Sequence, residues 1–262
     1  MDEHIILYVD FLGSKAAIRD WKEEQLEAFA TLLHNIAALR SEFASLTETP
    51  VDGATRSVIT PAVSTFSDHI VISYPTQHLR RFGGESSLSL MGLLPAQTLV
   101  SRIAAAAMRF GLLIRGGVTV GQLHHKGGVV LGKAMIEAYE LESRVSIYPR
   151  IAASRKLYSL IKANPPSPLS ALSTILLEDQ DGIIHLNYFK SMILAGGGQP
   201  GDEFTARLNT WLREARQTVA ENIERFEQGE SWNELAKWVW FRKHFNQGRE
   251  SYPSPLSDTM FD

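Results

Sequence analysis

Continuous apolar runs alternate along the chain with segments whose apolar residues recur at helical spacing. Residues 4–11, HIILYVDF, are a continuous apolar run rich in β-branched and aromatic side chains, which predicts a buried strand. In residues 23–46 apolar side chains recur every three or four positions, which predicts an amphipathic helix. The apolar positions of this helix are Leu26, Phe29, Leu33, Ile36, Leu39 and Phe43.

Strand pairs and helices follow in alternation. Residues 62–75, AVSTFSDHIVISYP, are typical of two short strands that meet at a polar turn, Ser67-Asp68, and end at Pro75. Residues 90–111 predict a second long helix with Gly111 as its C-cap. Further on, the pattern predicts two strands over 112–132, a helix over 133–145, a hairpin over 174–189 around Asp181-Gly182, and helices over 204–228 and 231–245.

This order of elements predicts the fold class. It indicates an α+β protein with a ferredoxin-like or palm-type mixed sheet, helices on one face and helices at the C-terminal end. A doubly wound parallel sheet would instead alternate single strands with helices. We expect the sheet domain over residues 1–195 and a helical extension over 196–262 that packs on the same domain.

Composition limits the class of protein further. The 262 residues are 44% hydrophobic with a net charge of −3, which does not suit a general nucleic-acid clamp. The chain has no cysteine, so thiolate metal sites and thiol nucleophiles are excluded. It enters a strand-like run at once, and no apolar segment reaches the roughly 20 residues that span a bilayer. We therefore expect a soluble cytoplasmic protein that binds neither nucleic acid nor a membrane.

Two aspartates stand at predicted turns. Asp10 ends the first strand, and Asp68 lies in the turn of the first hairpin. In a ferredoxin-like sheet the first strand is central and adjacent to that hairpin, so the two carboxylates can converge. Carboxylates are the ligands that hard cations such as Mg²⁺ and Mn²⁺ prefer, although aspartates are also common in turns and helix caps for structural reasons.

Glycines mark two further segments. Gly13, followed by Ser14 and Lys15, allows the backbone to approach a ligand at the start of the next helix, where free amides attract anions. Gly116, Gly117 and Gly121 interrupt a β-branched strand, which is typical of a bulge or a close backbone approach. The neighbouring His124 and His125 would point to opposite faces of a regular strand, and we interpret them as turn residues.

Taken together, these segments resemble the catalytic domain of class III nucleotidyl cyclases over roughly residues 4 to 190. The matching motifs, in the family's order, are VDFLG, FSDHIVIS, IRGGVTVG and GKAMIEAYELES. The resemblance implies that Asp10 and Asp68 bind two divalent metal ions, Mn²⁺ or Mg²⁺, with the carbonyl of Phe11 completing one site. It also implies that the backbone amides of Leu12, Gly13 and Ser14 hold the triphosphate, and that a homodimer forms its active sites at the interface.

The chain departs from the family at four positions. Purine cyclases carry base-reading polar residues where this chain has Ser64 and Val129. The family's Asn and Arg of the last helix fall at Ile136 and Glu140. Arg144 lies one helical turn beyond Glu140 on the same face, and Arg150 follows; either is a candidate to stabilise the transition state.

The segments AYELES and VGQLHH also resemble the pyrimidine cyclases of bacterial Pycsar anti-phage defence. This resemblance implies a uridylate cyclase that converts UTP to cyclic UMP and pyrophosphate, with the product sensed by a separate effector. Ser64, Thr65 and Arg115 are candidates for the base pocket. A cytidylate cyclase acting on CTP, a purine cyclase and a degenerate nucleotide-binding domain remain alternatives.

The tryptophan-rich C-terminal helix presents one apolar face. This face is formed by Trp232, Leu235, Trp238 and Phe241. Such a stripe packs on the domain or covers a dimer partner.

Overall fold

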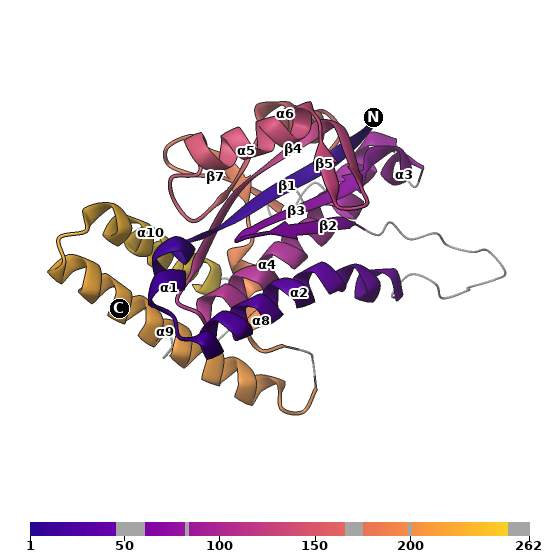
Figure 1. Ribbon diagram of the computed structural model, residues 1–262. Coiled ribbons are helices and arrows are strands. Elements are labelled where there is room, and N and C mark those ends of the chain that lie inside the picture. The colour runs from indigo at the N-terminus through magenta and orange to yellow at the C-terminus, as the bar shows by residue number, and fades with distance from the viewer. Residues whose placement is uncertain (46–60, 82–83, 166–174, 199–200, 251–262) are drawn as a thin grey trace.

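The computed structural model describes residues 1–45, 61–81, 84–165, 175–198 and 201–250 (Figure 1). The strands are β1 (Asp2–Leu12), β2 (Ala62–Phe66), β3 (His69–Pro75), β4 (Leu113–Lys126), β5 (Val129–Leu131), β6 (Ile151–Ala153), β7 (Leu176–Glu178) and β8 (Ile184–Leu186). The helices are α1 (Ser14–Asp20), α2 (Glu23–Ser45), α3 (Thr76–Arg80), α4 (Leu94–Met108), α5 (Lys133–Glu140), α6 (Arg155–Ala163), α8 (Phe189–Gly196), α9 (Phe204–Gln228) and α10 (Trp232–Glu250). A 3₁₀ turn, η1 (Gly84–Ser86), and two π-helical turns, η2 (Leu88–Leu93) and η3 (Leu141–Val145), accompany them.

The sheet confirms the predicted α+β, ferredoxin-like fold. Its strand order is β2-β3-β1-β4-β6-β8-β7, and β5 pairs with β4 outside this path. β1 lies between β3 and β4 and is antiparallel to both, so the order β2-β3-β1-β4 is that of a ferredoxin-like core. β6 runs parallel to β4, which makes the sheet mixed.

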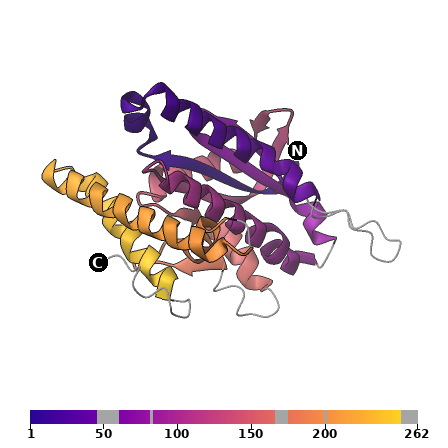
Figure 2. The same cartoon turned by 90° about the horizontal axis from the view of Figure 1, so that it is seen from below.

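Helices cover both faces of the central strands rather than the one face predicted, which explains why β1 is a continuous apolar run. Figure 2 shows α2, α4 and α9 lying across one face, where Ile5, Leu7 and Val9 join the main core. The opposite face carries α5, whose Ala134 and Ala138 pack on a second cluster that includes Ile6 and Tyr8. Strands buried on both faces read as apolar runs rather than as alternation.

The glycine-rich strand β4 allows α5 to lie directly on the sheet. A Cβ added to Gly117 would stand 2.2 Å from the carbonyl oxygen of Ala138 in α5. No side chain fits at that distance, so the interpretation of this glycine as a point of close approach is confirmed. The contact fixes α5, and the turn η3 that continues it, over the C-terminal half of β1.

The interpretation of His124 and His125 as turn residues is wrong. His124 is exposed and His125 is buried, as expected for neighbours in a strand, and both lie within β4. The ring of His125 is held between the hydroxyls of Ser64 and Ser73, each at 2.9 Å. The strand continues past the histidines because the turn begins only at Gly127 and Gly128, which have positive φ.

The pattern did not predict β6 and α6, which follow η3. β6 is only Ile151–Ala153, too short for an apolar run to identify it. α6 begins at Ser154, whose side chain caps the helix by accepting a hydrogen bond from the amide of Leu157 at 3.1 Å.

The C-terminal helices share the main core. Trp211 of α9 is buried and donates its indole hydrogen bond to the carbonyl of Ala105 at 3.1 Å. In α10, Trp238 and Phe241 are buried in the same core, whereas Trp232 is 62% exposed. Two of the four residues of the predicted apolar face, Trp238 and Phe241, therefore pack in the core of the domain.

One helical stretch differs from the expectation that no segment is long and apolar enough to span a bilayer. Residues Gly84–Met108 are long and apolar enough to cross a bilayer, by length and composition only. However, 61% of the most apolar window is buried inside the protein, as in the core helix of a domain.

Candidate active site

The strand register brings the two predicted aspartates together on the face that carries α5. Asp10 pairs in register with His69 of β3 and with Arg115 of β4. Asp68 precedes His69 in the β2–β3 turn, where Ser67 adopts a φ of 53°. One ligand atom from each of Asp10, Asp68 and His69 lies within 4.8 Å of the others. Their role as metal ligands stays a prediction.

Hydroxyl groups surround the carboxylate of Asp68. Ser14 donates to Oδ2 at 2.5 Å and Ser67 donates to Oδ1 at 2.9 Å. Burial acts to raise the pKa of Asp68, but these hydrogen bonds and the nearby His69 outweigh it and hold the pKa below its usual value. The group is therefore ionised at neutral pH, as a cation ligand must be.

The turn after β1 places its polar groups beside this pair. Gly13 has a φ of 89°, a left-handed conformation that favours glycine, and it starts α1. Ser14 is buried, and its hydroxyl lies 2.8 Å from the carbonyl oxygen of Phe11 as well as beside Asp68. The Phe11 carbonyl and the Asp68 carboxylate thus share one hydroxyl neighbour, while Lys15 is exposed to solvent.

Arg115 links Asp10 to a third carboxyl group. Its Nε donates to Oδ2 of Asp10 at 3.1 Å, and its Nη2 pairs with Oε1 of Glu142 at 2.6 Å. Glu142 is 2% exposed, and burial raises its pKa to about 7, helped by the charges of Asp10 and Asp68 and opposed by Arg115. The carboxyl groups of Asp10, Asp68 and Glu142 thus outnumber the one arginine, Arg115. This excess of acidic groups favours a bound divalent cation.

His69 stands between the two aspartates. Its Nδ1 lies 3.1 Å from Oδ1 of Asp68, and its Nε2 lies 3.5 Å from Oδ1 of Asp10. The ring stacks on Phe66 with centroids 5.2 Å apart. Sequence reasoning missed both His69 and Glu142, although each lies inside a quoted motif, FSDHIVIS and AYELES.

The predicted base-pocket residues lie on two different faces. Ser64 is in register with Val71, which pairs with Tyr8, so it shares the face of Asp10. Thr65 is in register with Ile70 of the main core, so its side chain lies on the opposite face from Asp10. Of the predicted pocket residues, Arg115 is the one in contact with Asp10.

The two candidate arginines differ in accessibility. The side chain of Arg144 is 75% exposed and pairs with Glu140 at 3.3 Å, so it does not contact the aspartates. Arg150 is 2% exposed and pairs with Asp179 at 3.1 Å and Asp181 at 2.6 Å. Its guanidinium is committed to the interior, so Arg144 is the accessible one of the two candidate arginines.

Comparisons with known proteins add little to this geometry. No family model matches the chain, and no curated protein matches it. Among solved structures, the chain is similar to one described as "Structure of a bacterial light-regulated adenylyl cyclase", with 14% identity and a TM-score of 0.38, over 80% of this chain and 98% of that one. This likeness is too low to assign a function, so the functional argument rests on the site itself.

Proposed function

We propose that the protein is a nucleotidyl cyclase that converts UTP to 3′,5′-cyclic UMP and pyrophosphate. The observation that carries this proposal is the convergence of Asp10 and Asp68 beside the turn formed by Gly13 and Ser14. Carboxylates beside a tight turn suit a divalent cation that accompanies a triphosphate.

In this proposal Asp10, Asp68 and the Phe11 carbonyl hold two divalent ions, Mn²⁺ or Mg²⁺. When bound, such ions neutralise charge on the reacting phosphates and favour displacement. The amides of Leu12, Gly13 and Ser14 hold the triphosphate. The 3′ oxygen forms a bond to the α-phosphorus, the bond from that phosphorus to the bridging oxygen breaks, and pyrophosphate leaves while the hydroxyl proton passes to solvent.

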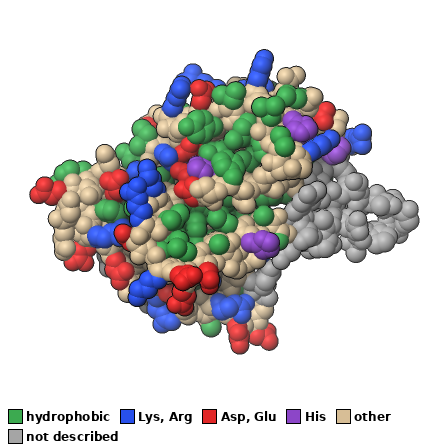
Figure 3. Space-filling view, viewed as in Figure 1, with side chains coloured by type: hydrophobic (Ala, Val, Ile, Leu, Met, Phe, Trp, Pro, Cys, Tyr) green, Lys and Arg blue, Asp and Glu red, His purple; other side chains and the backbone are tan. Residues whose placement is uncertain are grey.

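A second copy of the chain would complete the site. Arg144 does not contact the aspartates of its own chain, yet phosphoryl transfer needs positive charge near the reacting group. Apolar side chains gather on the face that carries α5 and β5 (Figure 3), and the exposed ones include Phe66, Val129, Leu131, Ile136 and Tyr139. Such a patch marks an interaction site. We infer a homodimer in which Arg144 of one chain serves the aspartates of the other.

The proposed preference for a pyrimidine rests on the absence of the two polar base-reading residues of purine cyclases at positions 64 and 129. Val129 is exposed and apolar, and the Ser64 hydroxyl is 2.9 Å from His125. Neither offers the pair of polar groups that purine cyclases use, which supports a pyrimidine. The anti-phage role and the separate effector follow from the resemblance to Pycsar cyclases, which make cyclic UMP or cyclic CMP. UTP is our leading choice between the two substrates, and a cytoplasmic setting is proposed as well.

A degenerate, non-catalytic domain is the alternative that one observation favours. Arg115 donates to Oδ2 of Asp10 and so competes with a metal ion for this carboxylate. In that case the protein would bind nucleotide without turning it over.

Product analysis tests the proposal. The purified protein is incubated with each of UTP, CTP, ATP and GTP in Mn²⁺ or Mg²⁺, and the nucleotides are separated. We expect cyclic UMP from UTP as the main product. Equal product from ATP would overturn the pyrimidine assignment, and no cyclic product from any triphosphate would overturn the enzyme.

Mixing inactive variants tests the shared site. We expect Asp68→Ala and Arg144→Ala each to be inactive alone. In a mixed dimer one site combines an intact Asp68 with an intact Arg144, so an equal mixture should recover about a quarter of wild-type turnover. A mixture that stays inactive, although it forms mixed dimers, would contradict the proposal that the two chains share the site.

A further inference from the structure

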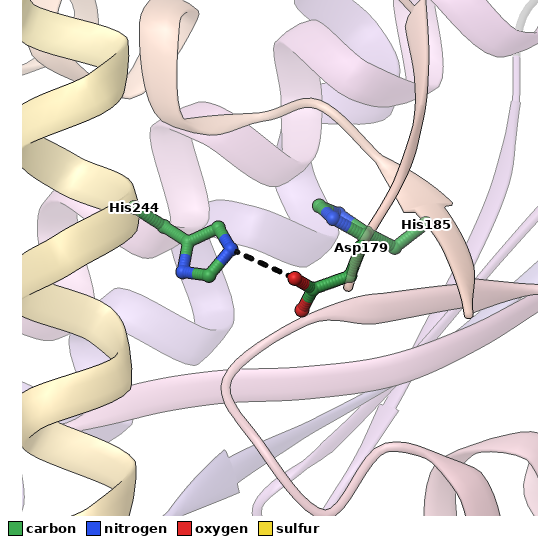
Figure 4. A group of neighbouring side chains, drawn as sticks. All are labelled: Asp179, His185 and His244. Atoms are coloured by element: carbon green, nitrogen blue, oxygen red, sulfur yellow. Dashed lines mark ion pairs between the residues drawn. The ribbon is translucent and has the colours of Figure 1, made fainter. Parts of the chain in front are cut away.

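A second cluster of potential ligands lies where α10 packs on the β7–β8 hairpin. One ligand atom from each of Asp179, His185 and His244 lies within 4.8 Å of the others. Figure 4 shows His244 reaching from α10 toward Asp179 and His185, which stand on the hairpin. His185 is 1% exposed and His244 is 8% exposed, and none of the three residues belongs to the candidate active site.

Backbone carbonyls fix the tautomer of both imidazoles. Nδ1 of His244 lies 2.9 Å from the carbonyl oxygen of Trp240, and Nδ1 of His185 lies 3.1 Å from that of Leu186. A carbonyl only accepts, so each Nδ1 carries the proton and each Nε2 keeps a lone pair. Metal-bound histidines are held in the same way by their second nitrogen.

The two carboxylate oxygens of Asp179 have different partners. Its Oδ2 accepts from Arg150 and from the indole of Trp240, both at 3.1 Å. Its Oδ1 accepts from the amide of Gln180 at 2.7 Å and faces Nε2 of His244 at 3.5 Å. Oδ2 is thus fixed by two hydrogen bonds, while Oδ1 faces the imidazole of His244. A carboxylate that binds a metal through one oxygen is arranged in the same way.

Charge around the cluster suits a cation. Arg150 is shared between Asp179 and Asp181, at 3.1 and 2.6 Å, so these side chains carry an excess of negative charge. The separation of 3.5 Å between His244 and Asp179 is beyond the usual range of a hydrogen bond, which leaves this pair weakly joined.

We propose that Asp179, His185 and His244 form a structural site for a first-row transition-metal dication, Zn²⁺ in the first instance. Two imidazoles and one carboxylate are a common Zn²⁺ ligand set, with water as the fourth ligand. The hard cations proposed for the active site prefer sites made of oxygen ligands. The metal would fasten α10 to the β7–β8 hairpin at the edge of the sheet.

Metal analysis of the full chain tests this site. The protein is stripped with a chelator, incubated with Zn²⁺, desalted and analysed for bound zinc. The samples are wild type, Asp68→Ala, which disables the other cluster, His244→Gln, and His124→Gln as a control at an exposed histidine. We expect His244→Gln to lose one equivalent of zinc and the other two variants to keep it. Equal zinc in wild type and His244→Gln, or none retained by wild type, would overturn the proposal.

Two further measurements distinguish the loss of a zinc site from the misfolding of a variant. Zn²⁺ should raise the Tm of Asp68→Ala by about 5 °C, because a ligand that binds only the folded state stabilises it, and should leave the Tm of His244→Gln unchanged. Co²⁺ added to Asp68→Ala should give the visible absorption of a cobalt ion bound to nitrogen and oxygen. Absence of that absorption would overturn the site whatever the variants show.

Discussion

The two clusters of acidic and imidazole side chains differ in the way they are held. Asp10, Asp68 and His69 sit at strand ends and a turn on the face with exposed apolar residues. Asp179, His185 and His244 are enclosed by α10, where Trp240 stacks on His244 with centroids 3.7 Å apart. The first cluster is built mainly of oxygen ligands next to the turn that begins α1, where we propose that the substrate binds. The second is built mainly of imidazoles fixed by backbone carbonyls, which suits a permanent ion.

In our two proposals, ligand chemistry and the setting of the ligands distinguish a site for turnover from a site for stability. A reactive site must release its product, so its ligands border solvent. A structural site gains from enclosure because its partners are fully formed only in the folded chain. Substitutions in the first cluster should therefore affect turnover, and those in the second should affect stability.

The largest expected effect is on turnover in Asp68→Ala. Removing this carboxylate removes a proposed metal ligand, and we expect turnover of UTP to fall by at least about 100-fold. The Tm should change little, because Asp68 lies in a turn. The matched control is Asp181→Ala, the turn aspartate of the other hairpin, which should keep turnover within about twofold. Retained activity in Asp68→Ala would remove Asp68 from the metal site.

The next effect is on stability in Arg150→Ala. This change removes the buried partner of the half-buried Asp179, and breaking a pair of this kind costs about 3 kcal/mol of unfolding free energy. Denaturant unfolding measures the loss. An unchanged free energy of unfolding would show that the ion pair of Arg150 with Asp179 does not stabilise the β7–β8 hairpin.

In contrast to Arg150→Ala, Arg144→Ala should lower turnover and leave stability nearly unchanged. Its pair with Glu140 is exposed, and such pairs contribute about 0–1 kcal/mol, so unfolding should be nearly unchanged. Turnover should fall by about 100-fold if this arginine faces the transition state. Steady-state kinetics decide the matter: full activity in Arg144→Ala would contradict the role, and Arg144→Lys should restore only part of the rate.

The smallest effect is a change in pH dependence in Glu142→Gln. Burial raises the pKa of Glu142 to about 7 in the folded protein, above its ordinary value of 4.5. The folded state therefore holds the proton more tightly, and its contribution to stability is complete below pH 4.5 and is lost as the pH rises through 7. Without metal, wild type should lose on the order of 2 kcal/mol over this range.

Glutamine cannot ionise, so Glu142→Gln should show a flatter profile over the same range. Urea unfolding at pH 5 and pH 8 in the presence of a chelator gives the comparison. Parallel profiles for the two proteins would show that Glu142 ionises without a folding penalty.

The sequence was informative where local signals coincide with topology. A run of apolar residues predicts β1, a polar turn predicts the β2–β3 hairpin, and the ferredoxin-like order places Asp10 near Asp68. The contact of Arg115 with Glu142 was not predicted, because it depends on how closely η3 approaches β4. That approach is set by Gly117, whose role as a point of close approach was foreseen without its partner.

The second cluster was beyond sequence reasoning. Asp179 and His185 lie on the predicted hairpin, but His244 is separated from them by α8 and α9 and belongs to no recognisable motif. Its position follows from the packing of Trp238 and Phe241 into the main core, which turns His244 toward the hairpin. Packing between distant elements is not encoded in the local period of apolar residues.

The central claim is that Asp10 and Asp68 bind the metal ions that accompany the triphosphate. Mn²⁺ binding measured by electron paramagnetic resonance, with 3′-deoxy-UTP present to prevent cyclisation, tests it most directly. In wild type we expect Mn²⁺ to bind together with the nucleotide, and in Asp68→Ala we expect this nucleotide-dependent binding to disappear while His244→Gln retains it. The same nucleotide-dependent Mn²⁺ binding in Asp68→Ala as in wild type would contradict the account.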